Sequence, residues 1–311
     1  SHMLLVGGGE DLVAPSQTAE RYVHRQGHGE SQWEPLPPMP ANRWLHGAAV
    51  LRGELYVCGG GDGVEALPSV DCYSPATGSW RPSPAMSQPR LGPSVVAHND
   101  ELYVCGGEVM QGEMDDADDA EVVSNTLRSA EIFNPDIQLW IPIASLAESR
   151  AGAGGASFQG AVYICGGSDS TNRAMQSVEL LYPVVGMWGY APSLAVPRHG
   201  AAVAVANHHL FAFGGRGNED AARWITVEML REGSSAWELV DTCMSCPRTY
   251  PAVAAVGGSI WIFGGFNGSE VEASVEKFDP KTATWSVAPR MTVPRYGGSA
   301  VCMLDTTPVF Q

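Results

Sequence analysis

Short apolar runs separated by turn residues recur along the whole chain. Between Arg248 and Arg295 there are three such runs, rich in β-branched and aromatic residues, and the segment around Trp285 supplies a fourth. Runs of this length and composition, bounded by glycine, proline and polar residues, predict the strands of an antiparallel meander. One meander of four strands cannot bury its own faces, so the pattern predicts that the unit is repeated.

The unit recurs six times with a period near 50 residues, marked by four landmarks in constant order. A Gly-Gly pair ends an apolar run at positions 7–8, 59–60, 106–107, 166–167, 214–215 and 264–265. An acid follows at Glu20, Asp71, Glu131, Glu179, Glu228 and Glu276, and then a tryptophan at Trp33, Trp80, Trp140, Trp188, Trp237 and Trp285. Arginines stand at Arg43, Arg90, Arg150, Arg198, Arg248 and Arg295. From an arginine to the next Gly-Gly pair there are 16 positions in each of five cases, which is far beyond chance.

This order of Gly-Gly, acid and tryptophan resembles the kelch repeat. The resemblance implies an all-β fold, a six-bladed kelch β-propeller with four antiparallel strands per blade. The first unit lacks its first strand, and residues 296–304 look like a first strand with no second strand after it. We therefore expect the C-terminal strand to join the N-terminal blade beside residues 4–8, which closes the ring and removes its open edges. We interpret residues 1–3 as vector-derived, 4–304 as a single propeller and 305–311 as a C-terminal tail.

Charge and cysteine content narrow the classes of partner. The net charge is −16, with two lysines in the whole chain, which disfavours nucleic acid and anionic membranes because both require a basic footprint. The longest apolar runs are too short to predict a membrane span. Seven cysteines is an odd number, and three of them precede Gly-Gly pairs on expected buried strands. This pattern is typical of reduced thiols and indicates an intracellular, cytoplasmic protein.

The sequence contains little that indicates catalysis. It has no nucleophile elbow, no His-Glu-x-x-His and no phosphate-binding Gly-rich loop with lysine. Cys243 and Cys246 form one Cys-x-x-Cys without the second pair that a structural zinc needs, and free thiols are the simpler interpretation. We therefore expect no catalytic residues, no metal and no cofactor, with a propeller enzyme as a remote alternative. The acidic stretch 113–121 in the longest loop is interpreted as a solvated loop, with a docking site for a basic partner or a metal site as alternatives.

The expected partner site lies at one mouth of the propeller. In an antiparallel meander, the start of the first strand and the end of the second lie at the same face. The loops that carry the six arginines and the loops after Gly-Gly should therefore meet there, and the arginines either brace the loops or donate to a partner's carboxylates. Exposed arginine, tryptophan and tyrosine together are typical of binding hot spots. The expected site residues are Arg43, Arg90, Arg150, Arg198, Arg248, Arg295, Arg216, Trp44, His199, Tyr250 and Tyr296.

This arrangement is similar to the kelch domains of BTB–kelch proteins, the substrate receptors of cullin-3 ubiquitin ligases. In that family the corresponding loops hold an extended peptide, often through arginines. The resemblance implies that this domain binds a protein or peptide with an acidic or phosphorylated segment. It also implies the substrate-recognition role of a ligase adaptor, with cullin-3 contacted through domains absent from this sequence. We expect the propeller to be monomeric. The alternative is a cytoskeletal or scaffolding protein that uses its sides or the acidic loop.

Overall fold

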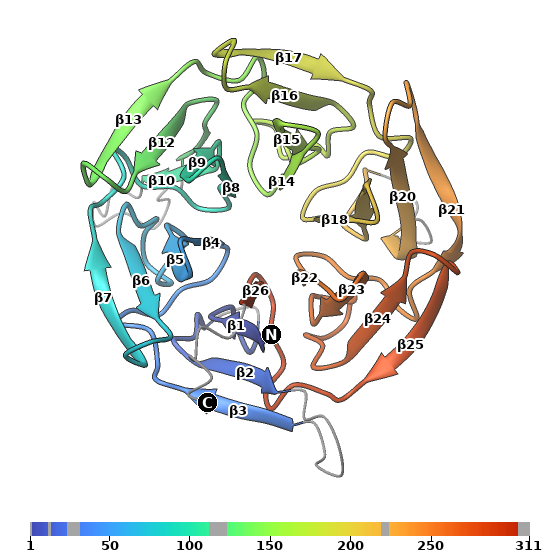
Figure 1. The fold of residues 1–311 in the computed structure, drawn as a ribbon, viewed down its shortest axis with the longest axis horizontal. Coiled ribbons are helices and arrows are strands. Elements are labelled where there is room, and N and C mark those ends of the chain that lie inside the picture. Colours follow the sequence, from blue (N-terminus) through green and yellow to red (C-terminus); the bar gives the residue numbers. More distant parts are fainter. Residues whose placement is uncertain (1, 12–13, 24–31, 112–122, 219–223, 304–311) are drawn as a thin grey trace, which may run out of the picture.

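Six four-stranded antiparallel sheets, the blades, surround a central axis in the computed structural model of the chain (Figure 1). The structure describes residues 2–11, 14–23, 32–111, 123–218 and 224–303. Blade 1 consists of β1 (His2–Val6), β2 (Ala19–Val23), β3 (Gln32–Leu36) and β26 (Ser299–Met303). Blade 2 consists of β4 (Gly47–Leu51), β5 (Glu54–Cys58), β6 (Val70–Ser74) and β7 (Ser79–Ser83). Blade 3 consists of β8 (Ser94–His98), β9 (Glu101–Cys105), β12 (Ala130–Asn134) and β13 (Leu139–Ile143).

The remaining blades have the same order of strands. Blade 4 consists of β14 (Gly154–Phe158), β15 (Ala161–Cys165), β16 (Val178–Tyr182) and β17 (Met187–Ala191). Blade 5 consists of β18 (Ala202–Ala206), β19 (His209–Phe213), β20 (Thr226–Arg231) and β21 (Trp237–Cys243). Blade 6 consists of β22 (Ala252–Val256), β23 (Ser259–Phe263), β24 (Val275–Asp279) and β25 (Thr284–Ala288). The prediction of an all-β, six-bladed propeller is confirmed.

Blade 1 is built from both ends of the chain. Strand β26 pairs antiparallel with β1, with Ala300 opposite Leu5, and β1 pairs in turn with β2. The predicted closure of the ring by the C-terminal strand is thus present (Figure 1). Strand β1 begins at His2, so it includes two of the three residues that we interpreted as vector-derived.

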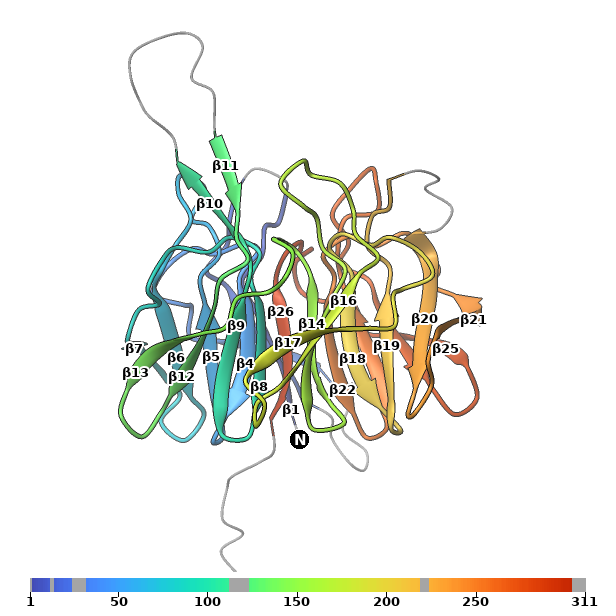
Figure 2. The ribbon, with the colours of Figure 1, turned by 90° about the horizontal axis from the view of Figure 1, so that it is seen from above.

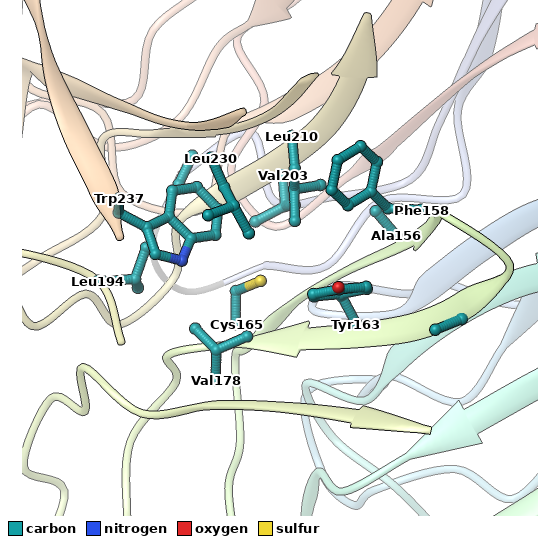
Figure 3. Packing of buried hydrophobic residues seen from close by; sticks show 12 residues of the cluster. Ala156, Phe158, Tyr163, Cys165, Val178, Leu194, Val203, Leu210, Leu230 and Trp237 are labelled. Carbon is teal, nitrogen blue, oxygen red and sulfur yellow. The ribbon is translucent and has the colours of Figure 1, made fainter. Parts of the chain in front are cut away.

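The core lies between neighbouring blades because the inner strands are covered on both faces. All five residues of β15 are buried, whereas the outer strand β17 alternates between exposed and half-buried positions. Between blades 4 and 5, Tyr163 and Cys165 of one blade pack with Leu210 and Trp237 of the next (Figure 3). The cysteines before the Gly-Gly pairs therefore serve as small apolar residues, and all seven thiols are free.

The repeated tryptophans join each blade to the one before it. The Nε1 of Trp237 donates to the carbonyl oxygen of Pro192 at 2.9 Å, and four other tryptophans make the equivalent bond. Trp285 is the exception, because its buried Nε1 has no hydrogen-bond partner.

One face of the propeller carries a two-stranded extension. Strands β10 (Glu108–Gln111) and β11 (Val123–Thr126) form a hairpin that rises from the rest of the molecule (Figure 2). The acidic stretch 113–121 follows β10, and it lies outside the described residues, as does the tail 305–311. Within the described part of the chain, no helix has the length and apolar character needed to cross a membrane.

Candidate functional site

The six repeated arginines lie inside the propeller. Their exposed fractions are 0 to 3%. In blade 5, the Nε of Arg198 donates to a carboxylate oxygen of Glu228 at 2.8 Å, and its Nη1 donates to the carbonyl oxygen of Gly214 at 2.6 Å. The same ion pair recurs in the other blades as Arg43–Asp71, Arg90–Glu131, Arg150–Glu179, Arg248–Glu276 and Arg295–Glu20. Of the two roles that we considered for these arginines, the structure shows the bracing of loops. The prediction that they bind a partner at the mouth is wrong, because their guanidinium groups are buried and already paired.

Each buried carboxylate has several donors. Besides Arg198, Glu228 accepts hydrogen bonds from the backbone N–H groups of Ala195 and Val196. Backbone N–H groups donate to five of the six repeated acids, and Asp71 accepts from the Nε and Nη2 of Arg43. A buried ion pair whose groups are hydrogen-bonded in this way makes a small net contribution to stability. The Nε of Arg150 is the exception, because it is buried and has no hydrogen-bond partner among the described residues. The repeated arginine–acid ion pair therefore connects the loop before each first strand to the second and third strands.

Arg216 is the predicted site arginine that does lie at the mouth. It follows Gly214-Gly215, and its backbone forms two hydrogen bonds with His199, at 2.7 and 2.8 Å. This bridge confirms that the loops before the first strand and after Gly-Gly meet at one face. The Arg216 side chain is exposed, and it forms no ion pair or hydrogen bond with any residue that the structure describes. Its charge is close enough to influence His199, Tyr250 and Tyr296.

Four ring-bearing residues gather beside Arg216, and we call them the aromatic cluster: His199, Tyr250, Phe266 and Tyr296. The rings of His199 and Tyr250 are 5.2 Å apart, those of Tyr250 and Tyr296 are 5.5 Å apart, and those of Phe266 and Tyr296 are 6.2 Å apart. All three pairs have edge-to-face geometry, which the quadrupole of aromatic rings favours. Trp44 lies next to the cluster, because it packs beside Gly9, whose backbone pairs with Tyr296.

Burial sets the protonation of the cluster. Burial, aided by the charge of Arg216, lowers the pKa of His199 to about 4, so its imidazole is neutral at pH 7. Burial raises the pKa of Tyr250 well above its ordinary value, so its hydroxyl keeps its proton. The Tyr250 hydroxyl lies 2.5 Å from the Nε2 of His199, and it donates to this nitrogen in that protonation state. The four rings of the cluster are therefore uncharged at pH 7, and the charges of Arg216 and Glu108 act on Tyr250 from beside them.

A ring of backbone hydrogen bonds surrounds the propeller axis at this face. Its members stand two positions after each repeated arginine, and we call them the axial ring: Leu45, Gly92, Gly152, Gly200, Tyr250 and Gly297. Each N–H donates to the carbonyl oxygen of the preceding member at 2.7 to 3.1 Å, and the six bonds close on themselves. All six residues have positive φ, which costs a residue with a Cβ about 1–2 kcal/mol. Leu45 and Tyr250 bear this cost, with φ of 49° and 52°.

Tyr250 reaches across the axial ring. A Cβ on Gly152 would lie 2.2 Å from the Tyr250 hydroxyl oxygen, so the tyrosine occupies the space that glycines leave open. Strained non-glycine residues of this kind cluster at functional sites. The sequence carried a signal for this feature, because glycine recurs two positions after the arginine in four units and is replaced in the other two. We did not use that signal.

A cavity of about 310 Å³ opens beside Arg216. Asn172, His199, Asn218 and Trp224 line it together with the arginine. The Nδ1 of His199 and the Nε1 of Trp224 are buried without a hydrogen-bond partner among the described residues. Neither here nor elsewhere in the described part of the chain do three His, Cys, Asp or Glu side chains come together in a way that could hold a metal ion.

Comparison with known proteins agrees with this geometry. The family model of the Kelch motif matches residues 45–87, 89–147, 149–194 and 247–292. Two F-box/kelch-repeat proteins of Arabidopsis thaliana are similar over short stretches. One is 49% identical over 45 residues, which is 14% of this chain and 13% of that protein. The other is 45% identical over 60 residues, which is 19% of this chain and 14% of that protein.

A solved structure, that of YjhT, has the same fold. It superposes with a TM-score of 0.73 over 92% of this chain and 97% of that chain, at 18% sequence identity. The matches to the two plant proteins span about one seventh of their length, so they concern the repeats alone. The Kelch motif covers more than half of the present sequence. The chain therefore belongs to the kelch-repeat family.

Proposed function

We propose that the mouth binds a segment of a protein partner through a carboxylate, which Arg216 holds against the aromatic cluster. The observation that carries the proposal is the exposed guanidinium of Arg216, which has no ion pair with any described residue of a chain whose net charge is −16. A free arginine in such a setting attracts an anion, and its planar fork matches a carboxylate with two hydrogen bonds.

The surroundings of Arg216 support a single carboxylate. His199 is neutral at pH 7 because burial lowers its pKa to about 4, so Arg216 supplies the one full positive charge among the described residues of the aromatic cluster and its cavity. Tyr250, Tyr296 and Phe266 present rings beside the charge, and tyrosine and arginine are enriched among residues that dominate binding energy. The partner segment that fits is an extended one, with Asp or Glu at Arg216 and an apolar side chain on the rings.

The test is a binding measurement with a library of immobilised peptides that carry one Asp or Glu each. The wild-type chain should retain a subset, and Arg216→Ala should bind that subset at least tenfold more weakly, because a charge-assisted hydrogen bond contributes about 1.5–3 kcal/mol. Arg231→Ala is the matched control, since Arg231 is exposed but lies at the end of β20 and pairs with Glu238. Equal affinities for the wild type and Arg216→Ala would contradict the proposal, and so would preferential binding of neutral peptides.

The wider role that we propose is substrate recognition in a cullin-3 ubiquitin ligase adaptor, and it rests on the resemblance to BTB–kelch proteins. The test is recovery of cullin-3 with the full-length protein from cell lysate. Recovery of cullin-3 by the full-length protein but not by this propeller would support the role. Co-sedimentation of the full-length protein with filaments, without cullin-3, would instead favour the cytoskeletal alternative.

A further inference from the structure

The outer strand of blade 4 lacks the protection that most of the other outer strands have. A propeller leaves the fourth strand of each blade as an edge strand, and edge strands are usually protected from pairing by charge or proline. Four outer strands have such protection: β3 has Glu34 and Pro35, β7 has Arg81 and Pro82, β13 has Pro142, and β21 has Glu238 and Asp241. Strand β17 reads Met-Trp-Gly-Tyr-Ala and has neither. Strand β25 also lacks both, but its hairpin turn carries Lys281.

Gly189 at the centre of β17 is not required by the fold of this chain. The equivalent positions, one after the repeated tryptophan, hold Glu34, Arg81, Ile141, Glu238 and Ser286, so this site accepts a side chain of any kind. Gly189 does not have positive φ, and a Cβ on it would meet no atom within 4 Å. Glycine in the interior of a strand weakens it and often marks a place where another backbone approaches closely. No described segment of this chain makes that approach, because β16 is the only neighbour of β17.

Apolar side chains surround this edge. Twelve large apolar residues are exposed in the described part of the chain, and eight of them lie on the outer strands and turns of blades 3 and 4. They are Ile137, Leu139, Ile141, Tyr182, Val184, Val185, Met187 and Tyr190. Blade 4 joins the chain just after β13, since the Nε1 of Trp188 donates to the carbonyl oxygen of Ala144. We call these eight residues the blade 3–4 patch.

The size and charge of the blade 3–4 patch fit a second copy of the chain. At roughly 100 Å² of exposed area per side chain, eight residues supply about 800 Å², which is the contribution of each partner to an interface of standard size. With a net charge of −16, two copies repel one another over most of their surface. The eight side chains carry no charge at pH 7; the nearest exposed acids are Asp136, which pairs with Arg52, and Glu148, which pairs with Arg150, so two copies face fewer unpaired like charges here.

In place of the monomer that we expected from the sequence, we propose that two copies of the chain pair through β17 to form a symmetric dimer. The strands run antiparallel with the two-fold axis at Gly189, so that Trp188 of one copy lies opposite Tyr190 of the other. The same residues then serve both copies, as a two-fold interface requires. The pairing satisfies the free backbone groups of β17, and the glycine lets the two backbones meet at the axis. The interface lies on the outer rim, away from Arg216, so the dimer and the binding proposal stand independently.

The test is sedimentation velocity of the purified chain over a range of micromolar concentrations. The wild type should sediment with twice the 33.0 kDa mass of the chain. Gly189→Glu should be monomeric and weaken association at least a hundredfold, because it places one acid from each copy at the axis. Glutamate already occupies this position in blades 1 and 5, so the fold tolerates it. Ser286→Glu makes the same change at the equivalent position of blade 6, and it should remain a dimer.

Two outcomes would overturn the proposal. One is a wild-type protein that stays monomeric over the whole concentration range. The other is a dimer that Gly189→Glu and Ser286→Glu leave equally strong, which would place the interface elsewhere. Near-ultraviolet circular dichroism and melting temperature of both variants establish that any loss of association is not a loss of folding.

Discussion

His46 should make the propeller sensitive to mild acid. Its side chain is 6% exposed, and neither ring nitrogen makes a hydrogen bond of normal geometry with a described residue. The ring extends from blade 2 towards blade 1, where its Cε1 lies 2.5 Å from the place that a Cβ on Gly7 would take. Burial, with the nearby charge of Arg43, lowers the pKa of His46 from 6.5 to about 3, and the backbone carbonyl of Val6 opposes this only in part.

The sign and size of the effect follow from these two pKa values. Between pH 6.5 and pH 3, the unfolded chain binds a proton at His46 and the folded chain does not, so the free energy of unfolding falls as the pH falls. Each pH unit below the pKa of His46 in the unfolded chain lowers the free energy of unfolding by about 1.4 kcal/mol. Lowering the pH from 8 to 5 therefore removes about 2 kcal/mol through this one residue.

Urea denaturation at pH 8, 6 and 5 measures the effect. His46→Gln has no group that titrates in this range, so it should lose about 2 kcal/mol less than the wild type between pH 8 and pH 5. His208→Gln is the control, because His208 is exposed in the turn between β18 and β19. The control should follow the wild type. Parallel loss of stability in the wild type and His46→Gln would refute the argument that His46 is buried in its neutral form.

Three further predictions concern stability and reactivity. Arg198→Met should lower the free energy of unfolding by about 3–5 kcal/mol in chemical denaturation, because it leaves a buried carboxylate unpaired. Arg231→Met breaks an exposed ion pair and should lower it by under about 1 kcal/mol. Similar losses in the two variants would contradict the burial of Arg198. Trp237→Phe should cost about 1 kcal/mol more than Trp285→Phe in thermal melts, since the indole N–H of Trp285 has no partner to lose. In iodoacetamide labelling followed by mass spectrometry, exposed Cys243 should react in the native protein and the four buried cysteines only after unfolding; early labelling of the buried thiols would contradict their burial.

The sequence was sufficient to predict the blades. Each strand has its own turn signals, and even the isolated run before residue 304 could be assigned to the first blade because it matched the other first strands. This works because the contacts within a blade are between consecutive strands, so local patterns carry most of the information.

Whether the side chains of the repeated arginines lie inside the propeller or at its surface was not predictable in the same way. Arg198 and Glu228 are 30 positions apart in the sequence, and their contact depends on how a loop folds back onto the second and third strands. Arginine is most often exposed, so the position of Arg198 in a loop favoured the surface. One feature of the sequence did indicate buried ion pairs, since the repeats contain six arginines and six acids in equal number. Arg216 was identified correctly as a mouth residue because its place after Gly-Gly depends only on strand order.

The axial ring has a consequence for how this protein can change. Its six hydrogen bonds use backbone atoms alone, and they form in the same way with glycine, leucine or tyrosine at the ring position. The diameter of the mouth is therefore independent of the side chains displayed around it. Residues such as Arg216 and Tyr296 can be exchanged over generations, or in a laboratory library, without altering the frame on which they stand. A propeller of this kind is a display scaffold whose ligand preference can vary while its architecture stays constant.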